Sequence, residues 1–249
     1  MKPGKLLRMQ RYAERQKTKP IQQENTTRMT NAFQSLVNKI HYGTNPWAGW
    51  PYDPNLTTDF GFVGWTGYFD QAIDHYRPDV IIEVGVLFGA SSRHMAQKLK
   101  NLGIDGAVIS ADTYLQEQVL WNIPEHRERL RMKNGRSQAY ELYMNNGIKY
   151  ELQDYMVPLA GDSRGCARHL LQRGVTAPVI YIDGSHMKDD VYQDYQLYWP
   201  LLRPGGVMIG DDYNPNGFAE LVADVNRFAA ENYVKVENHG DKLRIFKPA

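Results

Sequence analysis

Cysteine is almost absent from this sequence of 249 residues, in which Cys166 is the single example. An intrachain disulfide is therefore impossible, and a zinc site built from thiolates is not expected. Long apolar runs are also missing, since no stretch approaches the roughly 20 apolar residues that cross a membrane as a helix. These absences exclude a disulfide scaffold and a membrane-spanning protein, and we expect a protein of the reducing cytoplasm.

A marked excess of charge of either sign is missing as well, because 29 Lys and Arg residues are matched by 28 Asp and Glu residues. Seven of the basic residues lie within the first 19 positions, beside the single acid Glu14, which leaves the rest of the chain with a net charge of −5. This basic tail lacks the apolar core of a secretory signal. It is interpreted as a solvated arm or an oligomer contact, and the alternative is a patch for nucleic acid or a membrane surface. We expect no nucleic-acid partner.

Two segments precede the first predicted strand. Apolar residues recur every three or four positions over 26–40, which predicts a helix with one apolar face and suggests a homo-oligomer. Residues 42–67 are rich in aromatic side chains but interrupted by glycine and proline. This pattern predicts a long loop whose aromatic rings either stack on a ligand or cover the core. We therefore divide the chain into residues 1–67, an oligomer contact or a lid, and residues 68–249, the main domain.

The main domain alternates short apolar runs with helical periodicity. The runs are rich in β-branched residues and apolar on both faces, which is typical of strands buried between two layers of helices. Such alternation predicts a parallel sheet with right-handed crossovers. The expected strands cover residues 80–84, 107–111, 156–159, 179–182 and 207–209, and the expected helices cover residues 67–77, 90–102, 163–173, 187–202 and 217–231, with a helical cover over 114–154.

Two further apolar runs, 233–236 and 243–246, are separated by the turn sequence Asn-His-Gly-Asp at 238–241. This pattern predicts an antiparallel hairpin at one edge of the sheet. The predicted fold class is therefore α/β: a doubly wound, mostly parallel, Rossmann-like seven-stranded sheet with a C-terminal antiparallel hairpin and an N-terminal helical extension.

Ligands of an open parallel sheet bind outside the carboxyl ends of its strands. After the first predicted strand, Gly85 and Gly89 let the backbone turn tightly before a helix begins. Leu87 stands where a dinucleotide fingerprint has glycine, which counts against NAD. Such a glycine turn also occurs in many α/β proteins without a ligand. Asp112 follows the second strand, where a carboxylate can accept both hydroxyls of a ribose.

More acids follow the later strands. Asp162 comes after the third strand and either faces a ligand or caps the next helix. Asp183 follows the fourth strand, and Asp211 and Asp212 follow the fifth. Because neighbouring strand ends are only about 5 Å apart, these last three carboxylates can converge, and an all-oxygen ligand set favours a hard divalent cation such as Mg²⁺. His186 is then a nearby base. The alternative is that Asp212 caps a turn and that His186 is an ordinary polar residue.

Two motifs, YIDGSH at 181–186 and LLRPGGVMIGDDY at 201–213, resemble those of the class I S-adenosylmethionine-dependent methyltransferases. Within that class the chain resembles the metal-dependent sugar O-methyltransferases of macrolide and aminocoumarin biosynthesis. The stretch 79–213 also resembles the cephalosporin hydroxylase-like group, and the resemblance as a whole covers residues 45–246. The glycine turn departs from the family pattern, since Leu87 and Phe88 replace smaller residues.

The resemblance implies a role for each candidate site residue. It assigns the cofactor S-adenosylmethionine to the strand ends, and Mg²⁺ or another hard divalent cation to the converging acids. For the cofactor, it implies that Glu83, Gly85 and Gly89 contact the methionine part, that Asp112 contacts the ribose, and that Asp162 and Ser163 contact the adenine, with Asp183 at the border of the cofactor. For the metal, it implies the ligands Asp183, Asp211 and Asp212. It makes His186 the base, so that His186 and Asp183 are the catalytic residues.

The implied function is transfer of a methyl group to a hydroxyl of a small molecule, either a sugar, a glycoconjugate or a glycosylated natural product. Three alternatives stay open: a catechol-type O-methyltransferase, a cephalosporin hydroxylase-like oxygenase and a non-catalytic S-adenosylmethionine-binding protein. An iron oxygenase usually holds its metal with two histidines and one carboxylate. Only His186 lies among the acids of these motifs.

Overall fold

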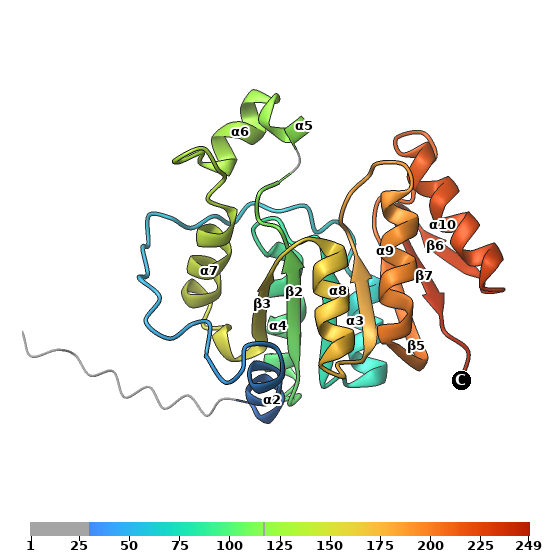
Figure 1. Cartoon of the computed structure of the whole chain (residues 1–249), viewed down its shortest axis with the longest axis horizontal. Helices are drawn as coiled ribbons and strands as arrows, with labels where there is room; N and C mark the ends of the chain where they lie inside the picture. The colour runs from blue at the N-terminus through green and yellow to red at the C-terminus, as the bar shows by residue number, and fades with distance from the viewer. Residues whose placement is uncertain (1–29, 117) are drawn as a thin grey trace, which may run out of the picture.

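The computed structural model describes residues 30–116 and 118–249. Its centre is a seven-stranded sheet in the order β3-β2-β1-β4-β5-β7-β6 (Figure 1). The strands are β1 (Val80–Val84), β2 (Ala107–Asp112), β3 (Met156–Ala160), β4 (Ala177–Ile182), β5 (Leu202–Gly210), β6 (Val236–His239) and β7 (Lys242–Phe246). The first five run parallel and β7 pairs antiparallel with both β5 and β6, so the predicted fold class is confirmed.

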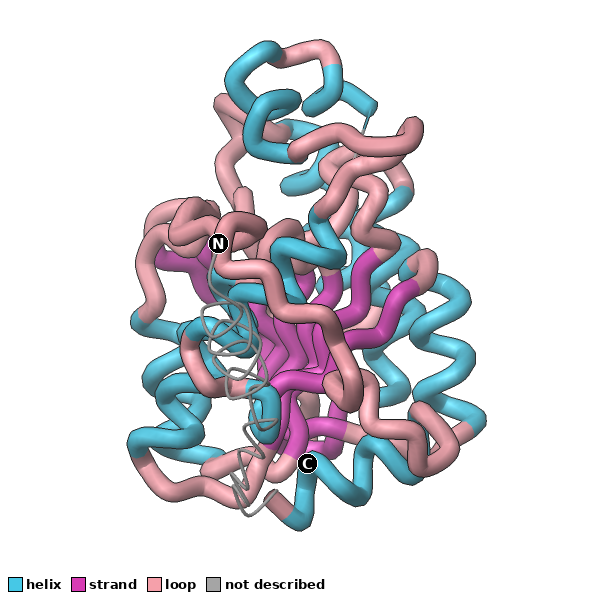
Figure 2. Tube along the Cα trace, turned by 90° about the vertical axis from the view of Figure 1, so that its left-hand side faces the viewer, coloured by secondary structure: helices cyan, strands magenta, loops and turns pink. Residues whose placement is uncertain are grey.

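Helices cover both faces of this sheet, which explains why β1 and β4 are buried along their whole length (Figure 2). The helices are α2 (Asn31–Ile40), α3 (Gly67–Tyr76), α4 (Ala90–Asn101), α5 (Gln118–Trp121), α6 (Pro124–Leu130), α7 (Ala139–Lys149), α8 (Ser163–Gln172), α9 (Asp190–Tyr198) and α10 (Ala219–Glu231), with short 3₁₀ turns at Gln153–Tyr155 and Trp199–Leu201. Helices α3 and α4 pack together, as do α8, α9 and α10. No helix in the described ranges is long and apolar enough to cross a membrane.

Helix α2 begins at a capped turn and buries its apolar face inside the chain. The Thr30 side chain accepts a hydrogen bond from the Phe33 backbone N–H, and Phe33, Leu36, Val37 and Ile40 are buried where α2 packs on β3. The predicted apolar face is therefore present, but the sheet covers it, and it gives no argument for self-association. The basic tail lies outside the described residues.

The aromatic segment after α2 contains no helix or strand, as predicted, and lies along α7. The Trp47 ring stacks on Tyr143 with 6.1 Å between centroids. The backbone N–H of Asp53 donates to the Asn145 side chain, and that of Thr58 to Asn146, at 2.9 Å each. This loop and α2 share one core with the sheet, and the division of the chain at residue 67 stays a prediction.

Among the strands, β5 and β6 begin farthest from their predicted boundaries. Strand β5 begins at Leu202, because the Arg-Pro-Gly-Gly segment before Val207 is part of the strand and forms an irregularity in its pairing with β4. Strand β6 begins at Val236 and extends to His239, which pairs with Lys242, so the hairpin turn is shorter than expected. The predicted cover over 114–154 consists of three separate helices, of which α5 and α6 stand beyond the carboxyl ends of the strands (Figure 1).

Candidate active site

The turn between β1 and α4 brings the ends of β1 and β4 together. Gly85 has φ +83°, and a Cβ atom there would lie 1.8 Å from the Asp183 carbonyl oxygen. Gly89 has φ +79°, and its Cβ would lie 2.7 Å from the Tyr143 ring. Glycine is therefore required at both positions by backbone conformation and by space. Gly85 and Gly89, which were both predicted to contact the cofactor, therefore set the conformation of this turn, and the turn packs against the Asp183 backbone at Gly85.

Glu83 lies beneath this turn and is fully buried. Its two carboxylate oxygens accept hydrogen bonds from the hydroxyls of Ser91 and Ser92 in the first turn of α4. Burial raises the pKa of Glu83 to about 7, against the opposing effect of the two serine hydrogen bonds. The structure thus binds the Glu83 carboxylate to two serines of α4, and the predicted contact of Glu83 with the methionine part of a cofactor stays a prediction.

Asp112 stands at the end of β2, as predicted, and binds backbone amides. Its Oδ2 accepts from Val86 at 2.6 Å and Leu87 at 3.0 Å, and its Oδ1 accepts from Tyr114 at 2.6 Å. Burial raises the pKa of Asp112 in spite of these hydrogen bonds. Asp112 thus ties the glycine turn to β2. Its Oδ1 also accepts a long hydrogen bond of 3.5 Å from the Thr113 hydroxyl, which a closer donor such as a ribose hydroxyl could replace.

Asp162 and Ser163 begin α8. The Asp162 side chain accepts from the Gly165 backbone N–H at 2.9 Å, which is the capping alternative considered for this residue. Ser163 donates its hydroxyl to Asp194 of α9, which the sequence reasoning missed. Burial raises the pKa of Asp194 to about 6. The pattern that could have revealed Asp194 is its place on the buried face of α9, one residue before Tyr195.

Three side chains converge beyond the ends of β4 and β5. Asp183, His186 and Asp212 each offer one ligand atom, and these atoms all lie within 4.8 Å of one another. The His186 Nε2 is 2.7 Å from Asp212 Oδ2, and the imidazole stacks on Phe218 with 4.8 Å between centroids. A small cavity of about 10 Å³ adjoins all three side chains. That volume is about the room that one water molecule needs.

Asp211 lies outside this group, although it was predicted as a metal residue. Its Oδ2 accepts from Lys242 of β7 and from the Tyr181 hydroxyl, the latter at 2.7 Å. Tyr181 also lies 2.7 Å from Asp183 Oδ2. Lys242 and Tyr181 were missed by the sequence reasoning, because nothing in the local pattern of β7 indicates that a lysine 31 residues from Asp211 turns inward. Asp211 is thus paired with a buried lysine while it borders the same small cavity as the converging group, and its predicted metal role stays a prediction.

The electrostatics of Asp183 favour a cation beside it. Burial, followed by the nearby negative charge of Asp211, raises the pKa of Asp183 well above its ordinary range. A divalent cation would reverse this effect by stabilising the ionised carboxylate. Two carboxylates around a space of this size are oxygen ligands that fit such a cation, and the imidazole of His186 lies beside them.

Comparisons with known proteins agree with the fold. A family model described as a methyltransferase domain matches residues 82–213, which is more than half of the chain. A curated relative, uncharacterized protein R132 of Acanthamoeba polyphaga mimivirus, is 25% identical over 154 residues, which cover 60% of this chain. The match spans 59% of that relative's length.

Solved structures with a similar fold include three bacterial proteins. The O-methyltransferase of Bacillus cereus in complex with SAH has a TM-score of 0.56 and 17% identity, over 78% of this chain and 85% of that one. A putative O-methyltransferase of Klebsiella pneumoniae has a TM-score of 0.56 and 14% identity, over 88% and 90%. The O-methyltransferase TomG of Streptomyces achromogenes in complex with SAM has a TM-score of 0.55 and 15% identity, over 87% and 90%. With the matched family model covering β1 to the end of β5, this chain belongs to the methyltransferase-domain family and carries a class I S-adenosylmethionine-dependent methyltransferase domain.

Proposed function

We propose that this protein is a divalent-metal-dependent O-methyltransferase that moves a methyl group from S-adenosylmethionine to a hydroxyl of a sugar, a glycoconjugate or a glycosylated natural product. The observation that carries the proposal is the convergence of Asp183, His186 and Asp212 at the carboxyl ends of β4 and β5. Ligands of open α/β sheets bind at this edge. The similar structures named as O-methyltransferases support the type of transfer.

The residues at the ends of β2 and β3 fit the nucleoside part of the cofactor. Asp112 would accept from ribose hydroxyls through the acceptor capacity left on Oδ1, and Asp162 has an exposed carboxylate of which one oxygen caps α8. Glu83 is fully buried beneath the glycine turn and accepts from two serines of α4, so it would support the turn that faces the methionine part of the cofactor. When bound, S-adenosylmethionine supplies an electrophilic methyl group on a sulfonium.

An alcohol is a poor nucleophile at neutral pH, so its proton must be removed as the methyl group is transferred. We assign Asp183 and Asp212 as the carboxylates that hold the cation, which when bound lowers the pKa of an acceptor hydroxyl and orients it. His186 would take the proton. Its hydrogen bond with Asp212 and its stacking on Phe218 both restrict the imidazole, as the orienting groups of a general base do.

The oxygenase alternative is less well supported by the donor set. Non-haem iron oxygenases usually bind iron through two histidines and one carboxylate, whereas the converging group has one histidine and two carboxylates. The family match is also to a methyltransferase domain.

The test is a transfer assay with radiolabelled S-adenosylmethionine against a panel of glycosides and catechols, with and without added Mg²⁺. We expect Asp183→Asn and Asp212→Asn to lower transfer by orders of magnitude while the fold survives. Asp74→Asn is the matched control, because Asp74 is an exposed carboxylate of α3 that pairs with Lys98. Undiminished transfer in the first two variants, or in excess chelator, would exclude the metal mechanism.

The role of His186 is tested separately with His186→Gln. If His186 is the base, kcat falls by about 10²- to 10⁴-fold while the dissociation constant of Mn²⁺, measured by calorimetry, stays close to that of the unchanged protein. A large loss of Mn²⁺ affinity in this variant would instead make His186 a metal ligand.

A further inference from the structure

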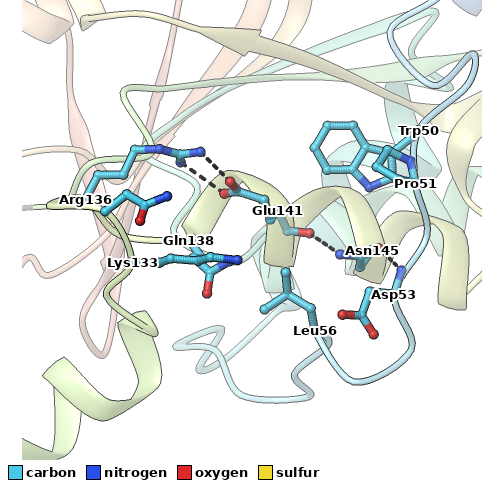
Figure 3. Close-up of a pocket in the computed structure, with 10 residues that line it drawn as sticks. Trp50, Pro51, Asp53, Leu56, Lys133, Arg136, Gln138, Glu141 and Asn145 are labelled. Carbon is cyan, nitrogen blue, oxygen red and sulfur yellow. Dashed lines mark hydrogen bonds and ion pairs between the residues drawn. The ribbon is translucent and has the colours of Figure 1, made fainter.

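A second cavity lies apart from the converging acids and shares no residue with them. It has a volume of about 410 Å³ and is bounded by the aromatic loop at 50–56, the segment 133–138 and the first half of α7 (Figure 3). In Figure 1, α7 stands on the side of the sheet where β3 lies, whereas α9 and α10 flank the opposite end. Its volume falls within the range of about 300–1,000 Å³ found for small-molecule sites.

The charges that line this cavity cancel. Two bases, Lys133 and Arg136, accompany two acids, Asp53 and Glu141. The guanidinium of Arg136 binds both carboxylate oxygens of Glu141, so this pair neutralises itself (Figure 3). The cavity therefore has no net charge with which to select an anion or a cation.

Polar groups with unused hydrogen-bonding capacity line the same space. Within the described ranges the side chains of Lys133, Asn134 and Gln138 make no hydrogen bond to the protein. By contrast, Asn145 uses both ends of its amide, which accepts from the Asp53 backbone and donates to the Glu141 carbonyl. The Asn145 side chain is thus held by its own hydrogen bonds, while Lys133, Asn134 and Gln138 offer donors and acceptors to a ligand.

Apolar surface completes the lining. Trp50, Pro51 and Leu56 come from the loop, and the Trp50 ring is held edge-on against Tyr140 with 5.6 Å between centroids. An aromatic ring beside several amide groups suits a ligand that has both apolar C–H faces and many hydroxyls. Neutral saccharides have this combination, while inorganic phosphate and glycine lack the apolar face.

We propose that this cavity, lined by Trp50, Lys133, Asn134 and Gln138, binds a neutral saccharide at a site separate from the candidate catalytic group. The proposal does not depend on the proposed methyl transfer, since the cavity contains none of the residues assigned to it.

The test is isothermal titration of the full chain, without S-adenosylmethionine or metal, using maltose, cellobiose and lactose at millimolar concentrations. We expect at least one disaccharide to bind. Trp50→Phe, which reduces the aromatic surface that lines the cavity, and Gln138→Ala, which removes a lining amide, should each weaken binding by about fivefold. Trp65→Phe is the matched control, because the Trp65 ring packs against His239 elsewhere and its replacement should leave binding unchanged.

Glycine and inorganic phosphate are titrated in parallel, together with Lys133→Met. Binding of either charged probe in place of the disaccharides, abolished in Lys133→Met, would overturn the assignment to a neutral saccharide. The absence of binding by every disaccharide, in protein whose thermal unfolding is normal, would overturn the site itself. Equal disaccharide affinity in Trp50→Phe, Gln138→Ala and Trp65→Phe would place the saccharide elsewhere on the chain.

Discussion

Two buried ionisable residues near the site affect the free energy of unfolding, and the first is Glu83. Its pKa is raised from 4.5 to about 7 by burial. The unfolded chain therefore releases this proton at a lower pH than the folded chain does, so the stabilising contribution is complete below about pH 4.5 and is lost as the pH rises towards 7. The difference corresponds to about 3 kcal/mol of unfolding free energy.

We expect Glu83→Gln to remove this pH dependence, because the amide cannot ionise but can still hydrogen-bond to Ser91 and Ser92. Urea unfolding at pH 5 and pH 8 measures the effect, with the exposed Glu220→Gln as the control. If the unchanged protein and Glu83→Gln lose the same stability between the two pH values, the buried carboxylate does not govern that loss.

Lys242 is the second case, because it is a buried cation paired with Asp211. The two side chains are only 5% and 14% exposed. Lys242→Met leaves buried carboxylates without their counter-charge and should lower the unfolding free energy by about 3–5 kcal/mol. The double variant Lys242→Met with Asp211→Asn should lose less than the first change alone, since the unpaired charge on Asp211 is removed with its partner.

Urea denaturation of the single and double variants measures this coupling. Simple additivity of the two changes in unfolding free energy would mean that the ion pair does not hold Asp211 in place.

Among the elements, the turn between β1 and α4 is the most constrained. Gly85→Ala would place a Cβ 1.8 Å from the Asp183 carbonyl oxygen, in a backbone conformation that only glycine adopts readily. The β4 end must then move, and we expect a large loss of stability together with a loss of cation binding. Gly103→Ala is the matched control, because Gly103 also has a positive φ but no atom within 4 Å of its Cβ position.

The control substitution should cost only about 1–2 kcal/mol, which is the price of a left-handed backbone with a side chain. Thermal unfolding and calorimetric titration with Mn²⁺ compare the two variants. Equal stability and equal Mn²⁺ affinity would show that the ends of β1 and β4 are not coupled through this contact.

The elements themselves were predictable because their signals are local. Buried parallel strands are short β-branched runs, and a Gly-Asp turn between two such runs predicts a hairpin; both patterns matched the structure except at β5 and β6, whose boundaries depend on pairing partners. The positions of Asp112, Asp162 and Asp183 at strand ends followed from the same patterns. The atoms that those side chains face did not, because spacing along the chain does not set the direction of a side chain.

Glu83 and Asp211 show most clearly that the direction of a side chain could not be predicted from the sequence. Asp211 directly follows β5, where spacing predicts a ligand, whereas Glu83 lies within β1 and was assigned to the cofactor by the resemblance alone. Their orientation is decided by partners on other elements, two serines of α4 in one case and Lys242 of β7 in the other. His186 was predicted as a base beside the metal, and its placement among the three converging groups depends on the conformation of the loop after β4.

For the whole molecule, the converging group predicts that a divalent cation stabilises the fold. A ligand at about 100 times its dissociation constant adds about 2.7 kcal/mol to the unfolding free energy when it binds only the folded state. Mn²⁺ or Mg²⁺ at such a concentration should raise the midpoint of thermal unfolding by roughly 5–10 °C. Chelator should abolish the increase, as should Asp183→Asn or Asp212→Asn.

Differential scanning calorimetry measures this shift, with Asp74→Asn again as the control. An increase that persists in Asp183→Asn and Asp212→Asn would assign the cation to another part of the molecule.

The position of Lys242 late in the chain has a consequence for biosynthesis. During translation, the acids at the ends of β4 and β5 leave the ribosome before the strand that carries their buried counter-charge. Until that strand inserts between β5 and β6, Asp211 lacks its ammonium partner. A nascent chain halted before residue 242 would therefore hold all the groups assigned to catalysis but not the buried ammonium that offsets the negative charge of Asp211.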